Sequence, residues 1–162
     1  MNGGDGGDGA AGADGGPPDA PASGAAIVRL DLAGTVLFAA VTVLASLVDD
    51  DWAAMVNLVV SAVLFVGGFA AFAAGFLRAA ARSRTEVVDL AGLFYLTGSA
   101  PGAVRRVLLG AWFVQIAVAA ASVFRVSPPF GVMAPVWGIG LLTLWGALHG
   151  RFPARSPRGT AR

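Results

Sequence analysis

Three polar side chains stand out because they lie in or beside long apolar stretches of the sequence. They are Asp31, Asn57 and Gln115. Carboxylate and amide groups are costly to bury in an apolar environment unless they find hydrogen-bond or ionic partners. These three residues are therefore the candidate intramembrane polar contacts, because the elements that must carry them are apolar enough to cross a membrane.

Asp31 follows Arg29 near the start of the first apolar stretch. Long side chains at such an end can reach the headgroup region, and residues two apart on a helix do not face each other. We expect Asp31 to act as an interfacial anchor or to pair with Arg105 or Arg106 at the start of a later stretch. The alternative is a proton- or cation-coupled carboxylate.

Gln115 and Asn57 are placed deeper. Gln115 follows Arg106 by nine residues, about 13 Å at helical rise, which is close to the middle of a bilayer. Asn57 lies about five residues from the other face. Interhelix hydrogen bonds of amides contribute roughly 0.6 to 2 kcal/mol. We interpret both as contacts between helices, and a substrate or ion contact is the alternative.

Other reactive groups are scarce. The chain has no cysteine and one histidine, His149, which excludes disulfides and thiolate metal sites and leaves too few nitrogens for a histidine-rich haem or zinc site. No glycine loop carries the lysine or acidic partner of a nucleotide site. The net charge of +1 gives no field that attracts nucleic acid. We predict no catalytic residue, no metal, no cofactor and no nucleic-acid partner.

Four uncharged runs define the elements. They cover residues 32–48, 52–77, 107–124 and 126–148, and crossing the hydrocarbon core takes about 20 apolar residues. Only 13% of the 162 residues are charged, against about 25% in soluble domains. The predicted fold is all-α, a four-transmembrane-helix bundle with spans at about residues 27–48, 52–77, 107–124 and 130–148.

Arginines set the expected orientation. An even number of spans places both termini on one face, and ten of the eleven basic residues fall on that face, all of them arginine. Only Arg125 lies on the other. Positive charge favours the cytoplasm, so we predict a multi-pass plasma-membrane protein with both termini cytoplasmic.

The remaining segments are polar or amphipathic. Residues 1–25 are rich in Gly, Asp and Pro and predict a disordered tail, either a spacer or a partner-binding segment. Residues 26–150 form the membrane domain, and residues 151–162 a basic cytoplasmic tail. Within the long connection, residues 86–96 predict an amphipathic helix in the cytoplasmic interface; a re-entrant loop or a soluble fold are the alternatives.

Gly67, Ala71 and Gly75 recur every four residues in the second span. Small residues at this spacing let helix backbones approach closely in lipid. We predict a helix-packing face here, either within the chain or against a partner.

Two stretches, LFYLTGSAPGAVRRVLLGAWFVQ and FGVMAPVWGIGLLTLWGALHGRFPAR, resemble small, uncharacterised four-span membrane proteins of actinobacteria. The resemblance covers residues 85–154. It implies an integral membrane protein and carries no activity that could be transferred.

The sequence thus favours a non-enzymatic membrane protein, an accessory or assembly subunit that contacts the bilayer and either a membrane-protein partner or further copies of itself. The alternative is a small oligomeric transporter or channel that uses Gln115, Asn57 and Asp31 along its pathway. A membrane enzyme is the third hypothesis, and no catalytic cluster supports it.

Overall fold

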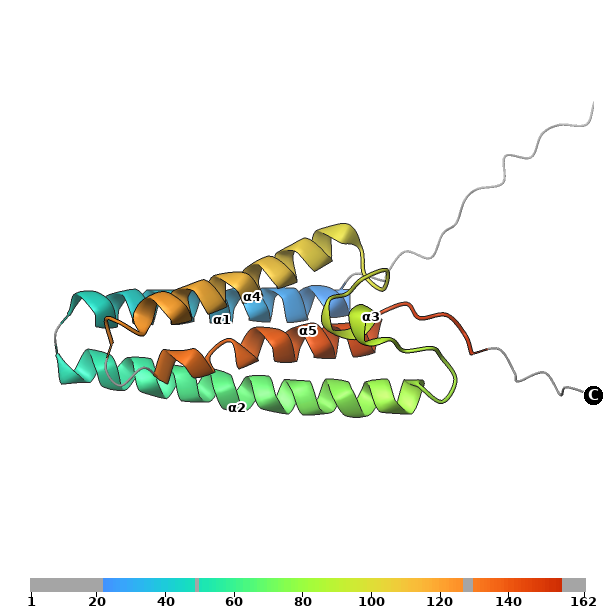
Figure 1. The fold of residues 1–162 in the computed structure, drawn as a ribbon, viewed down its shortest axis with the longest axis horizontal. Coiled ribbons are helices and arrows are strands. Elements are labelled where there is room, and N and C mark those ends of the chain that lie inside the picture. Colours follow the sequence, from blue (N-terminus) through green and yellow to red (C-terminus); the bar gives the residue numbers. More distant parts are fainter. Residues whose placement is uncertain (1–21, 49, 127–129, 156–162) are drawn as a thin grey trace, which may run out of the picture.

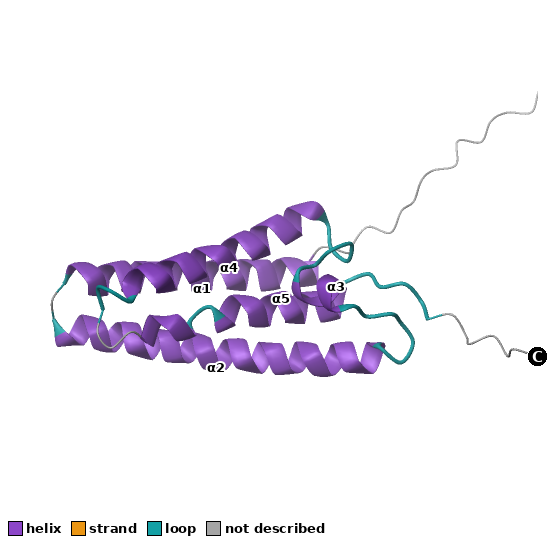
Figure 2. Ribbon diagram, in the orientation of Figure 1, coloured by secondary structure: helices purple, strands orange, loops and turns teal. Residues whose placement is uncertain are grey.

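The computed structural model describes residues 22–48, 50–126 and 130–155. Every regular element among them is a helix, apart from one isolated β-bridge between Glu86 and Ala154. In chain order they are α1 (Ala22–Leu47), α2 (Asp51–Arg82), α3 (Leu90–Phe94), α4 (Gly102–Ser122), the 3-10 turn η1 (Phe130–Met133) and α5 (Val136–His149). The predicted all-α class is confirmed (Figure 2).

Four segments are long and apolar enough to cross a membrane: Gly24–Leu47, Asp51–Arg82, Gly102–Ser122 and Phe130–His149. They run alternately in opposite directions, so the start of α1 and the end of α5 lie at the same end of the bundle (Figure 1). The predicted four-helix bundle is therefore confirmed. These segments make the chain a multi-pass membrane protein.

The fourth segment is the centre of the bundle. More than half of it is buried, against about a quarter of each of the other three. Leu141, Leu142 and Ala147 of α5 are almost inaccessible, whereas α1, α2 and α4 each expose many large apolar side chains. An exposed apolar surface of this extent fits a lipid environment, in which only the inward stripe of each helix is covered by protein.

The helices α2 and α5 lie side by side in backbone contact. A Cβ atom added at Gly68 would lie 2.5 Å from the Trp137 backbone, and one at Gly75 would lie 2.8 Å from the Leu144 nitrogen. Gly140 meets the Gly68 carbonyl from the other side. Only glycine fits at these positions, because the two backbones are in direct contact.

The predicted packing residues lie along this contact between α2 and α5, the α2–α5 seam, but they contribute to it in different ways. Gly75 touches the α5 backbone, whereas Gly67 leaves room for the Trp137 ring, since a Cβ there would be 2.8 Å from it. Ala71 is half-buried. The face is thus used within the chain, and Gly68, which the four-residue spacing missed, is its tightest point.

Several boundaries differ from those predicted. Residues 22–25 belong to α1 and not to a tail, and residues 1–21 lie outside the described part of the chain. The helix predicted over residues 86–96 is only α3, five residues long, because Glu86 and Val87 pair instead with residues 153–154. Of the basic tail, residues 151–155 are described, and they fold back against the long connection.

Arg82 joins the end of α2 to the end of α5. Its guanidinium forms an ion pair with Glu86 at 2.7 Å and donates hydrogen bonds to the carbonyls of Ala147 and Gly150. It also lies over the Phe152 ring, 5.2 Å from the centroid. Free carbonyls at the end of a helix need such donors, so Arg82 of α2 caps the C-terminus of α5.

Candidate functional site

Gln115 of α4 lies at the centre of a buried polar network that joins three helices. Its Nε2 donates to Thr35 Oγ1 at 2.6 Å and lies 3.3 Å from Asp31 Oδ1, both on α1. Its Oε1 accepts a hydrogen bond from the Gly138 backbone nitrogen of α5 at 3.1 Å. Both N–H groups of the amide and one of the two lone pairs of its oxygen are thereby used between helices.

The inward face of α1 explains this arrangement. Asp31, Thr35, Phe38 and Thr42 follow one another at intervals of three or four residues and are all buried, so they form one stripe of the helix. Thr35 Oγ1 also donates to the Asp31 carbonyl one turn earlier, at 2.8 Å. This bond fixes the hydroxyl so that its lone pair faces Gln115.

The contribution of α5 comes from the start of the helix. Pro135 is the N-cap, and it supplies no side-chain hydrogen bond to the first turn. The first backbone N–H groups of a helix have no acceptor within it. Gly138 satisfies one of them through Gln115, and a Cβ at Gly138 would lie 2.8 Å from Gln115 Oε1. Glycine at this position therefore admits the amide.

A second contact joins α1 to α2. Thr42 Oγ1 donates to Asn57 Oδ1 at 3.0 Å, and both residues are buried. Ser61, one turn beyond Asn57, is fully buried, and its hydroxyl has no partner among the described residues. The polar contacts thus bond α1 directly to α2 and α4, and α5 is bonded to α4 through Gln115.

Asp31 is the residue that departs most from expectation. It is fully buried, with Oδ1 facing Gln115 and Oδ2 without a partner among the described residues. The predicted pairing with Arg105 or Arg106 is wrong in this structure, because those side chains donate to the carbonyls of Tyr95 and Gly102. The side chain points into the bundle and not toward the headgroup level.

Sequence reasoning selected Asp31, Asn57 and Gln115 and missed their partners Thr35, Thr42 and Gly138. The signal for the threonines was their position four and eleven residues after Asp31, which places them on its face. No sequence signal pointed to Gly138, because its role depends on where α5 begins.

Asp31, Asn57 and Gln115 line neither the cavity beside Trp145 nor the one beside Arg105 and Arg106. The described residues also contain no group of three or more His, Asp or Glu side chains that could hold a metal ion. The network thus connects helices and does not line a described cavity. Comparison with protein-family models, with curated proteins and with solved structures finds no match to this chain.

Proposed function

We propose that this chain is a non-enzymatic, multi-pass protein of the plasma membrane that acts as an accessory or assembly subunit. The carrying observation is a ladder of four phenylalanines on α2, Phe65, Phe69, Phe72 and Phe76. Their spacing of four, three and four residues places them on one side of the helix. Phe72 stacks on Phe94 of α3, with centroids 5.9 Å apart, whereas Phe69 and Phe76 remain exposed beside the seam that α5 fills.

The rings of the ladder are ordered against one another. Phe65 and Phe69 stack with centroids 6.5 Å apart, and Phe72 and Phe76 with centroids 6.3 Å apart. Phe69 and Phe76 are nevertheless 61% and 51% exposed. Preformed, rigid aromatic surface loses little entropy when a second helix covers it, which favours packing against another membrane protein.

The polar network supports the same proposal. Buried polar groups that bond across helices hold a bundle in one arrangement, and here they face inward. The surface of α2 that a partner would meet is left apolar. The resemblance to small actinobacterial four-span proteins remains a prediction and adds no activity.

The test is native mass spectrometry of the tagged chain, extracted from its own membrane. We expect one partner at fixed stoichiometry, lost from Phe69→Ala/Phe76→Ala. The matched control is Phe113→Ala/Phe124→Ala, which removes two exposed phenylalanines outside the ladder and should keep the partner. A monomer or homodimer from the unchanged chain contradicts the proposal.

The cytoplasmic location of both termini is part of the proposal. It is supported by the arginine distribution, because Arg82 and Arg151 lie at the end of the bundle shared by the start of α1 and the end of α5, and Arg125 follows α4 at the other. The chain lacks cysteine, so single cysteines introduced at Asp50 and Ser83 can be labelled separately. A membrane-impermeant maleimide should label position 50 from outside and position 83 only after lysis; the reverse pattern contradicts the orientation.

One observation favours a second candidate, a small transporter. Asp31 buries an unpartnered carboxylate oxygen close to the start of α5, and intramembrane carboxylates near broken helices serve proton or cation coupling in transporters. Vesicles that contain the protein should then carry protons or Na⁺ faster than protein-free vesicles, and Asp31→Asn should abolish the difference. Equal flux in all three preparations contradicts this candidate.

A further inference from the structure

We infer that the cavity between the start of α1, the start of α4 and the end of α5 binds the headgroup region of an anionic phospholipid. The cavity holds about 650 Å³, within the range of ligand sites in proteins. It lies at the end of the bundle where α4 diverges from α1 and α5 (Figure 1). This inference is independent of the assembly role proposed above.

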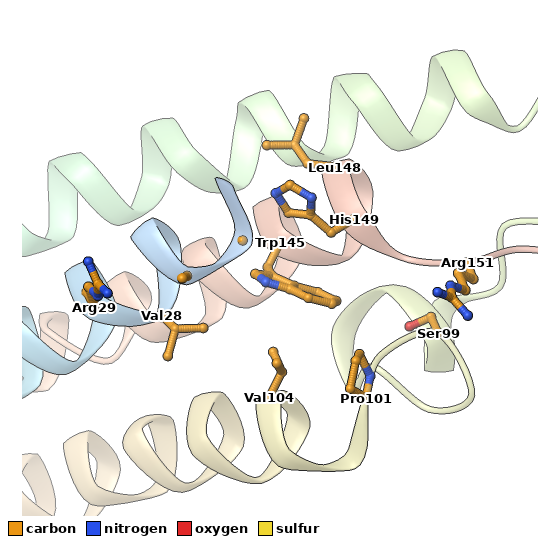
Figure 3. Close-up of a pocket in the computed structure, with 11 residues that line it drawn as sticks. Val28, Arg29, Ser99, Pro101, Val104, Trp145, Leu148, His149 and Arg151 are labelled. Atoms are coloured by element: carbon orange, nitrogen blue, oxygen red, sulfur yellow. The ribbon is translucent and has the colours of Figure 1, made fainter. Parts of the chain in front are cut away.

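The walls of the cavity are apolar. Val28 of α1, Val104 of α4 and Leu148 of α5 line it, together with the Trp145 ring. Figure 3 shows this ring between His149 above and Val104 below. Such walls suit the upper part of acyl chains, which a soluble anion lacks.

The polar atoms of the cavity are donors and cations. Arg29 and Arg151 line it, on opposite sides of the Trp145 ring in Figure 3, and His149 lies next to that ring, with 5.5 Å between the ring centroids. No Asp or Glu is among the described lining residues. The one ion pair within the described part of the chain joins Arg82 and Glu86, so neither lining arginine is neutralised there. A ligand with phosphate oxygens supplies the missing negative charge.

Trp145 gives an independent indication of a ligand. Its side chain is only 5% exposed, and Nε1 has no hydrogen-bond partner among the described residues. The indole N–H of a buried tryptophan normally finds an acceptor. Nε1 lies beside Gly24 of α1, which also lines the cavity, and a Cβ added there would be only 3.0 Å from it. A lipid phosphate or ester oxygen is an acceptor of the right kind.

The position along the bundle selects a lipid as the source of that oxygen. The cavity lies level with the arginine-rich end, where headgroups meet the helices, and basic pockets between membrane helices are known to hold anionic headgroups. The volume accommodates a headgroup and its glycerol, with the acyl chains continuing along the exposed apolar surface of α1 and α4.

The experiment measures lipid affinity by native mass spectrometry of the full chain in detergent, titrated with phosphatidylglycerol or with phosphatidylcholine of the same acyl chains. We expect phosphatidylglycerol to bind at least about tenfold more tightly. Equal affinity for the two lipids, or a second copy of the chain in place of a lipid adduct, overturns the inference.

Two pairs of arginines provide a matched comparison. Arg29→Gln/Arg151→Gln should weaken phosphatidylglycerol binding about tenfold or more, whereas Arg78→Gln/Arg84→Gln, which removes two exposed arginines outside the cavity, should change it less than about threefold. An equal loss in both variants would show general surface attraction and would overturn the site.

Trp145→Phe tests the donor separately. It should weaken phosphatidylglycerol binding about tenfold, because the indole N–H is lost. The smaller ring also lowers the unfolding midpoint, because Trp145 packs in a buried apolar cluster, so binding is compared at a temperature where both proteins stay folded. Unchanged binding contradicts the role of Nε1. Soluble glycerol phosphate at millimolar concentration should not displace the lipid; efficient displacement would mean that the site takes a soluble phosphate, and would also overturn the inference.

Discussion

Gln115 Nε2 lies 3.3 Å from Asp31 Oδ1, although the two residues are 84 positions apart in the sequence. The contact joins α1 and α4, and the oxygen of the same amide holds the first turn of α5. One side chain thus links three of the four long helices. The buried network therefore holds these helices in one arrangement. The free energy of unfolding should depend on its individual hydroxyl and amide groups.

Thr35 and Thr143 form a natural matched pair. Both are buried, and each hydroxyl donates to a carbonyl four residues earlier at 2.8 Å. Only Thr35 also accepts from Gln115. We expect Thr35→Val to lower the free energy of unfolding by about 1 kcal/mol more than Thr143→Val, since only the former breaks an interhelix bond. Unfolding in mixed micelles with increasing dodecyl sulfate measures both; equal losses would mean that the Gln115 contact is not stabilising.

Thr42 and Asn57 should be energetically coupled. Their hydrogen bond crosses from α1 to α2 at 3.0 Å, and bonds of this kind in membrane proteins contribute roughly 0.6 to 1.7 kcal/mol. A double-mutant cycle with Thr42→Val and Asn57→Leu should give a coupling energy in that range. The control cycle pairs Asn57→Leu with Thr143→Val and should give a value near zero. Equal coupling in both cycles would refute the specific contact.

Gly68 should tolerate alanine poorly. The new Cβ would lie 2.5 Å from the Trp137 backbone, so the α2–α5 seam must open, at a cost of about 1–3 kcal/mol. Gly110→Ala is the control, because nothing lies within 4 Å of a Cβ there. That variant should be neutral or gain up to about 1 kcal/mol from helix propensity. If both variants unfold at the same dodecyl sulfate fraction, the seam is not as close as described.

Arg82 should be more important to stability than the neighbouring arginine one turn earlier. Arg82→Gln removes donors to the Ala147 and Gly150 carbonyls and the ion pair with Glu86. We expect a loss of about 2 kcal/mol, and increased hydrogen exchange over residues 147–155. Arg78→Gln, at an exposed position, should change stability by less than about 0.5 kcal/mol. Unaltered exchange in Arg82→Gln would contradict the capping role.

Hydropathy was sufficient to predict the four long helices, because a bilayer requires about 20 apolar residues per crossing and the charges cluster between the runs. The depth of Asp31 was not predictable in the same way. α1 begins at Ala22, earlier than the apolar run suggests, and this extra length carries Asp31 away from the helix end. The partner of Asp31, Gln115 of α4, depends on a tertiary contact that hydropathy does not reveal.

The long connection shows a similar limit. The periodicity over residues 86–96 is helical, but only Leu90–Phe94 forms a helix. The backbone of Val87 is used in pairing with Pro153, at 2.8 Å, and a contact with a segment so distant in sequence leaves no local pattern. The phenylalanine ladder was visible in the sequence by its spacing, but its exposure depended on which side of α2 the α5 helix covers.

We propose that this protein packs the preformed apolar face of α2 against another membrane protein. Native mass spectrometry of the chain and of Phe69→Ala/Phe76→Ala, each taken from the native membrane, tests it most directly. We predict a heteromeric complex of fixed stoichiometry for the unchanged chain and its loss in the variant, with Phe113→Ala/Phe124→Ala retaining it. A monomer or homodimer throughout, or a complex that survives loss of the ladder, would contradict the proposed assembly role.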